Sequence, residues 1–191
     1  MNTKEKMEMS RPQTVKVGVG YGWQKGVKSC RDDQVWTTIR DFFKSASRGM
    51  EKPGMLKVDF RRLRASDGDI ISSSIFRKIE MADILIFDVA ATPKVLQNVR
   101  KKRTLNFNCL LELGAALALK KKIFVLSPVG LRKTMPSDLS GILLSEYSMS
   151  VKEGKLKREF VDKIGLGNQY RAKLRSVLRE KSAKKANEIA D

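Results

Sequence analysis

The chain has 191 residues, of which 41% are hydrophobic and 31% are charged, and this composition excludes a disordered or fibrous protein. It contains no histidine, which excludes Ser-His-Asp and Cys-His catalysis and the common histidine metal sites. We expect neither a metal nor a cofactor. Its net charge of +18 predicts attraction to an anionic ligand, partner or surface.

The first residues and the apolar segments bear on where the protein resides. Residues 1–13 are charged and lack an apolar segment, so we expect a flexible leader rather than a secretion signal, and a cytoplasmic protein. The longest apolar stretch, residues 109–119, is interrupted by Glu112 and is too short to cross a bilayer. We therefore expect no interaction with a membrane.

Apolar runs typical of strands alternate along the chain with segments of helical spacing. The patterns predict strands over residues 15–19, 55–60, 84–89, 123–126 and 147–151, and helices over residues 32–47, 70–81 and 106–119. The runs 84–89 and 123–126 are uninterrupted, which is typical of strands buried on both faces. We expect an α/β, flavodoxin-like three-layer sandwich with a mainly parallel sheet of about five strands.

The composition becomes strongly basic towards the end of the chain. We predict helices over residues 155–164 and 168–190, and a division into a leader (1–13), an α/β domain (14–152) and a basic helical extension (153–191). The extension is either solvated or holds an acidic protein partner. Nucleic acid is a less favoured partner because the basic residues lack interleaved aromatics for base stacking.

Glu112 is the one charged residue between Cys109 and Leu119. On a helix that covers a sheet, Leu110, Leu113 and Leu117 are expected to face the core, which leaves Glu112 off that stripe, near Asn108. Such a carboxylate is either an ordinary charged side chain near the helix start or a functional carboxylate whose pKa is raised by apolar surroundings. The pattern alone leaves both interpretations open.

Ligands of a parallel α/β sheet bind at the carboxyl ends of its strands. Gly20, Tyr21 and Gly22 follow the first predicted strand, and their spacing does not fit the dinucleotide fingerprint. The glycines suit close approach of a ligand to the backbone, and Tyr21 either stacks on a base or packs. Asp88 ends the third strand, where it contacts ligand or accepts a hydrogen bond from a neighbouring loop.

A basic tetrad lies between the third predicted strand and the helix that carries Glu112. It is formed by Arg100, Lys101, Lys102 and Arg103. A run of this kind is usually solvated, but its place near the ligand edge also suits attraction of a phosphate or pyrophosphate group.

Two blocks carry a resemblance to a known family. Residues 82–89 (ADILIFDV) and 106–118 (NFNCLLELGAALA) resemble nucleoside 2-deoxyribosyltransferase-like and TIR-like proteins, and the likeness extends over about residues 15–126. It implies a flavodoxin-like fold and cleavage of an N-glycosidic bond, with Glu112 as the catalytic carboxylate and Asn106, Asn108 and Asp88 as ligand-binding positions. Deoxyribosyltransferases tend to have aspartate where this chain has Asn106, and this moves the expectation towards the TIR-like side.

The resemblance therefore predicts a homo-oligomeric enzyme that cleaves the N-glycosidic bond of NAD, as substrate, or of a related nucleotide. A carboxylate such as Glu112 can stabilise or capture the oxocarbenium-like centre that this reaction forms. The alternatives are a nucleoside 2-deoxyribosyltransferase or nucleotide N-glycosidase, and a non-catalytic nucleotide-sensing or interaction module. Asn106 is alternatively a helix cap.

Overall fold

The computed structural model describes residues 13–21, 30–48, 50, 56–63, 71–90, 105–134, 144–152 and 155–190. The strands are β1 (Gln13–Tyr21), β2 (Leu56–Arg62), β3 (Ile84–Asp88), β4 (Lys122–Pro128), β5 (Leu144–Lys152) and β6 (Lys155–Phe160). The helices are α2 (Cys30–Ser47), α3 (Ile71–Met81), α4 (Phe107–Ala118) and α5 (Lys163–Ala190), with a short 3-10 helix, η1, at Leu131–Thr134.

The six strands form one sheet in the order β2-β1-β3-β4-β5-β6. All neighbours are parallel except β5 and β6, which pair antiparallel at one edge. The order of the first five strands is that of the flavodoxin-like doubly wound fold. The predicted fold class is therefore confirmed, with one more strand than the sequence patterns indicated.

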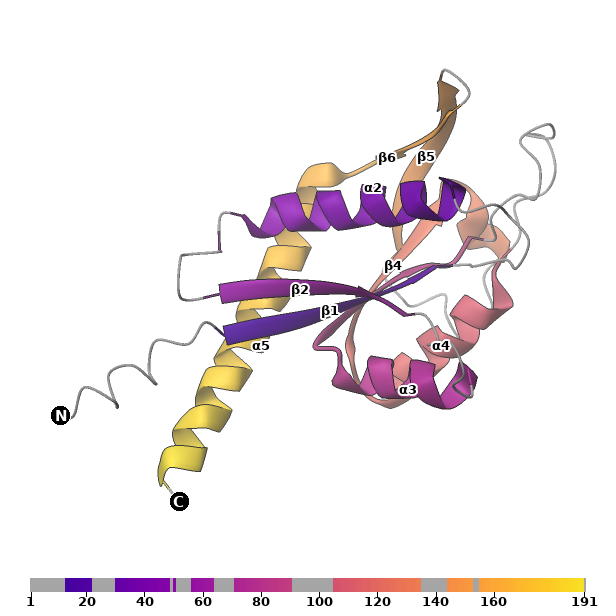
Figure 1. The fold of residues 1–191 in the computed structure, drawn as a ribbon. Coiled ribbons are helices and arrows are strands. Elements are labelled where there is room, and N and C mark those ends of the chain that lie inside the picture. Colours follow the sequence, from indigo (N-terminus) through magenta and orange to yellow (C-terminus); the bar gives the residue numbers. More distant parts are fainter. Residues whose placement is uncertain are drawn as a thin grey trace.

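Helices cover both faces of the sheet, and the alternation of side chains along each strand divides the core between them. Figure 1 shows α3 and α4 together on one side of the sheet and α2 on the other. The α2 and α5 side buries Val15, Val17 and Val19 of β1, and the α3 and α4 side buries Leu85 and Phe87 of β3. Burial of this apolar area stabilises the three layers.

The prediction of a helix over residues 155–164 is wrong. Residues 155–160 pair with β5 instead, and the ring of Phe160 lies 4.5 Å from that of Phe42, measured between centroids. Tertiary contacts thus override a pattern with helical spacing. The glycines at 165 and 167 do not interrupt α5, and the backbone N–H of Gly165 donates to Asp162 Oδ1 at 2.7 Å near the helix start.

The basic helix α5 packs closely on the sheet. Leu166, Tyr170, Leu174 and Val177 are buried in the same cluster as Phe43 of α2. The division of the chain near residue 152 stays a prediction, although the part beyond it contributes a strand and a helix to the layers described above.

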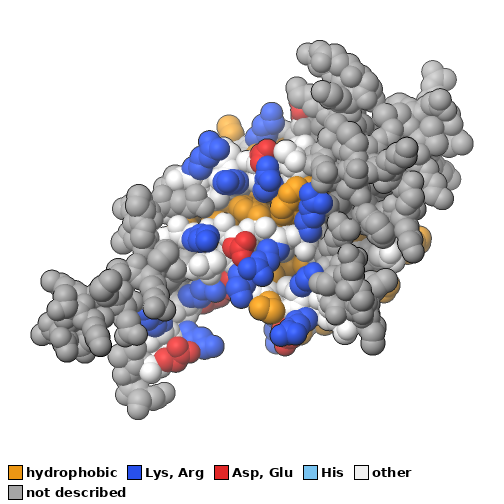
Figure 2. All heavy atoms as spheres, viewed as in Figure 1, with side chains coloured by type: hydrophobic (Ala, Val, Ile, Leu, Met, Phe, Trp, Pro, Cys, Tyr) orange, Lys and Arg blue, Asp and Glu red, His pale blue; other side chains and the backbone are white. Residues whose placement is uncertain are grey.

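Positive charge is spread widely over the described surface. In the space-filling view, Lys and Arg side chains outnumber the acidic ones across the visible described part (Figure 2). Several are paired, as in the contacts of Lys122 with Glu180 at 2.7 Å and of Lys181 with Asp83 at 3.0 Å. Within the described ranges, no helix has the length and apolar character needed to cross a membrane.

Candidate functional site

The start of α4 is fixed to the end of β3 by a short network of hydrogen bonds. Asn106 is the N-cap of the helix, and its Oδ1 accepts a hydrogen bond from the backbone N–H of Cys109 at 3.0 Å. Its own N–H donates to the carbonyl of Val89 at 2.9 Å. The expected capping role of Asn106 is confirmed, and its side-chain oxygen is engaged by this bond.

The buried face of α4 differs from the predicted one. Cys109, Leu113 and Ala116 are buried, whereas Leu117 is exposed and Leu110 only partly buried, so the Leu110, Leu113 and Leu117 stripe is wrong. The small residue Ala116 allows α4 to lie close to the sheet. This orientation turns Glu112, which lies beside Cys109 and Ala116 on the helix surface, towards the sheet and half-buries it.

The Glu112 carboxylate lies against Gly20 of β1. A Cβ atom built on Gly20 would be 3.0 Å from Glu112 Oε2 and 2.7 Å from Cδ1 of Phe87, which is the neighbour of Gly20 on β3. Any other residue at this position would force one of these groups to move. Gly20 is thus required for close contact between the carboxylate and the strand.

This contact occurs near the carboxyl ends of β1 and β3. These two strands flank the topological switch point of the flavodoxin-like strand order, because α2 leaves β1 on one face and α4 leaves β3 on the other. Doubly wound proteins bind their ligands in the crevice at this point. Glu112 and Gly20 therefore lie at the place in the fold where a ligand is expected.

Burial raises the pKa of Glu112 from 4.5 to about 7. The chain has no histidine, the residue that usually titrates in this range. A carboxyl group with this pKa is present in both protonation states near neutral pH. It can therefore accept a proton, donate one, or act in its ionised form as a nucleophile.

Cys109, one turn before Glu112, is a buried structural thiol. Its Sγ–H donates to the backbone carbonyl of Asp88 at 3.4 Å. Burial raises the pKa of the Cys109 thiol well above its usual value, and the nearby carboxylates of Glu112 and Asp88 raise it further. The thiol is therefore not ionised at neutral pH and is unsuited to nucleophilic catalysis.

Asp88 is buried at the end of β3, with 2% of its surface exposed. Its Oδ1 accepts hydrogen bonds from the Tyr147 hydroxyl at 2.8 Å and from the Ala90 backbone N–H at 3.3 Å. Tyr147 belongs to the core under α2 and α5, so the Asp88 carboxylate and Glu112 lie on opposite faces of the sheet. Contact of Asp88 with a ligand stays a prediction.

Local sequence patterns do not predict the hydrogen bond between Asp88 and Tyr147. The two residues are 59 positions apart, and the Tyr147 side chain reaches Asp88 across β4, which lies between their strands in the sheet. The one signal in the sequence was the position of each residue: an acidic side chain ends a buried strand, and a tyrosine begins the predicted strand 147–151.

The other predicted site residues are placed as follows. Asn108 is exposed on α4, one turn before Glu112, and Tyr21 pairs its backbone with Asp88 at the end of β1. Gly22 and the tetrad Arg100, Lys101, Lys102 and Arg103 lie outside the described residues. In the part of the chain that is described, no three His, Cys, Asp or Glu side chains form a group able to hold a metal ion.

No family model matches the chain, and no curated protein matches it. Among solved structures, a 2-desoxiribosyltransferase from Leishmania mexicana is similar at 16% sequence identity with a TM-score of 0.39. The match covers 59% of this chain and 64% of that one, which is less than two thirds of either.

Proposed function

We propose that this protein cleaves the N-glycosidic bond of a nucleotide or nucleoside, with NAD as the first substrate to test and Glu112 as the catalytic carboxylate. The observation that carries the proposal is the Glu112 carboxyl group, which lies against Gly20 at the β1–β3 switch point with a pKa of about 7. A carboxylate is the group that N-glycosidic cleavage needs beside the anomeric carbon.

In the proposed reaction the bond between C1′ and the base nitrogen breaks, and its electron pair leaves with the base. Positive charge then develops on C1′ and the ring oxygen. The ionised Glu112 either stabilises this centre until water adds, or forms a bond to C1′ that water or another base later displaces. Nicotinamide departs as a neutral molecule, so cleavage of NAD needs no general acid.

The half-buried position of Glu112 suits this role. Burial by the protein opposes ionisation of Glu112, whereas a positively charged nicotinamide riboside would favour the ionised form. As the bond breaks, the positive charge moves from the nicotinamide ring to C1′ and the ring oxygen. A carboxylate beside C1′ therefore stabilises the charge more strongly in the transition state than in the bound substrate. A preference of this kind lowers the activation barrier.

The proposal also gives roles to the other binding residues that the sequence predicts. Asn108 would hold a ribose hydroxyl one helical turn from Glu112, and Tyr21 would stack on the base beside Gly20 and Gly22. The tetrad Arg100, Lys101, Lys102 and Arg103 would attract the pyrophosphate. These assignments favour a nucleotide over a bare nucleoside as substrate.

Transfer of 2-deoxyribose between bases is the alternative reaction. The capping hydrogen bond of Asn106 argues against transfer, because the side-chain oxygen at this position already accepts the Cys109 N–H. The amide also cannot exchange a proton as an aspartate could at that position. Hydrolysis, in which water accepts the sugar, requires no such group and is the reaction we place first.

The test is release of free base, measured by chromatography after incubation of the protein with NAD. A separate incubation with deoxynucleosides and a second free base detects transfer. Glu112→Gln should abolish release, and Glu80→Gln, an exposed glutamate on the neighbouring helix α3, should not change it. Unchanged turnover by Glu112→Gln would overturn the proposal, and saturable nucleotide binding without any turnover would favour a nucleotide sensor.

A further inference from the structure

A small groove lies between the end of α3 and the face of β1 and β2. Its apolar lining includes Gly18 of β1, Leu63, and Met81 and Ala82 at the end of α3. A side chain on Gly18 would crowd this space, because a Cβ atom there would lie 2.7 Å from Cδ2 of Leu85 and 3.1 Å from Cδ2 of Leu63. The absence of a side chain on Gly18 therefore helps to keep the groove open.

The volume of the groove limits the size of the group that it can hold. The groove has a volume of about 40 Å³. A water molecule needs about 10–15 Å³ of such space, so the groove accommodates roughly three groups of that size. It therefore suits a short alkyl chain and is too small for an aromatic ring system.

Three cations line the same groove, one from each element that surrounds it. They are Lys16 of β1, Arg61 of β2 and Lys78 of α3. Asp59 of β2 accepts a hydrogen bond from Nε of Arg61 at 2.7 Å. Three positive charges and one negative charge leave these four residues with a net charge of +2. The groove thus combines apolar space with attraction for an anion.

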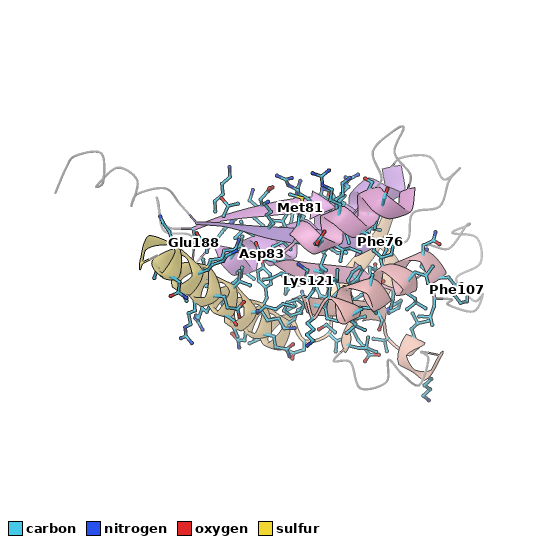
Figure 3. All side chains as sticks on the ribbon, turned by 90° about the horizontal axis from the view of Figure 1, so that it is seen from below. Phe76, Met81, Asp83, Phe107, Lys121 and Glu188 are labelled. Carbon is cyan, nitrogen blue, oxygen red and sulfur yellow. The ribbon has the colours of Figure 1, made fainter. Side chains whose placement is uncertain are left out.

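The end of α3 does not oppose an anion in the groove. Carbonyl groups at the C-terminus of a helix carry partial negative charge. Here Lys121 Nζ donates to the carbonyl of Ala82 at 3.1 Å and to that of Glu80. Figure 3 shows Lys121 and Met81 at this end of α3. The ammonium group of Lys121 offsets the negative charge of the carbonyls and adds another cation close to the groove.

We infer that this groove binds a small carboxylate with a short apolar chain, such as butyrate. A phosphate dianion is held best at the start of a helix or by both sides of an arginine fork. In this groove a helix ends, and Arg61 already contacts Asp59 through Nε and Nη2. The ammonium groups of Lys16 and Lys78 are point charges that suit a single negative charge, and the chain would lie on the apolar lining.

The test is titration of the isotope-labelled protein with sodium butyrate at constant ionic strength, followed through the backbone amide signals by NMR. We expect saturable shifts of the Gly18 and Ala82 signals, with a dissociation constant on the order of 1–10 mM for so small a ligand. Affinity should rise about fourfold for each methylene from acetate to butyrate and then level off, because the groove is full. Butanol, which has the chain without the charge, should bind at least tenfold more weakly.

Charge variants locate the bound anion. Lys16→Gln and Lys78→Gln should each weaken butyrate binding about threefold, and Lys44→Gln, on the exposed surface of α2 across the sheet, should leave it unchanged. The absence of saturable shifts, equal affinity for butanol, or equal effects of the three variants would overturn the inference. Shifts centred on Gly20 and α4 would place the anion beside Glu112 and would also overturn it. Because no readout uses turnover, the result is independent of the proposed function.

Discussion

Replacing Glu112 by glutamine has a predictable effect on stability as well as on turnover. The pKa of Glu112 rises from 4.5 to about 7 on folding because burial disfavours the charged form. Each pKa unit corresponds to about 1.4 kcal/mol, so ionisation of the buried carboxyl lowers the free energy of unfolding by up to about 3 kcal/mol. Since the side chain is only half-buried, we expect about 1–3 kcal/mol.

The direction of this effect follows from proton linkage. The folded state binds the proton more tightly, so the stability that protonated Glu112 contributes is complete below pH 4.5 and is lost as pH rises through about 7. Glutamine stays neutral at every pH. Glu112→Gln should therefore match the wild type in acid and exceed it above about pH 8.

Urea denaturation of both proteins between about pH 4 and pH 9 measures this difference. Glu80→Gln, on the surface of α3, is the control for replacing a glutamate. Its stability relative to the wild type should not rise with pH through about 7 as that of Glu112→Gln does. A stability difference for Glu112→Gln that is constant with pH would refute the argument. Lower stability of Glu112→Gln at high pH would show that the carboxylate is solvated or paired.

The same pKa governs the pH dependence of the proposed reaction. If Glu112 acts in its ionised form, kcat/KM should rise with pH through about 7 and then level off. A rate that instead falls through this range would assign Glu112 as a general acid.

Substitutions at three positions, two of them with a comparison variant, test the surroundings of the site. Gly20→Ala should lower stability by about 1–3 kcal/mol and reduce turnover, because the added Cβ would lie 2.7 Å from the Phe87 ring. Gly167→Ala within α5 should instead stabilise the protein by up to about 1 kcal/mol, because the nearest atom to its Cβ is 3.8 Å away. Thermal unfolding of both variants measures the difference. Tyr147→Phe removes a buried hydrogen bond to a carboxylate and should cost about 1.5–3 kcal/mol in urea denaturation, an expectation that unchanged stability would contradict. Asn106→Ala should cost about 1 kcal/mol through loss of the helix cap, and Asn106→Asp should restore it; equal losses would rule out the capping explanation.

Local sequence patterns predict most of the architecture and the position of the candidate group, but not β6. Alternating apolar runs and helical spacings are local patterns, and they were sufficient to predict the parallel α/β sheet. The pattern around Glu112 singled it out as an isolated charge on an apolar helix, and the resemblance added a chemical role. Asn106 was predictable as a cap because capping depends on residues only three positions apart.

The face that α4 buries and the contacts of Glu112 depend on packing between distant parts of the chain. Leucine spacing predicts one buried face of α4, but the helix turns Cys109 and Ala116 to the sheet. The space between the helix and the strands depends on distant residues such as Gly20 and Phe87, and it favours close approach of α4 on this side. That rotation half-buries the carboxylate and raises its pKa. Burial is a sum over neighbours far apart in the chain, and no local pattern contains it.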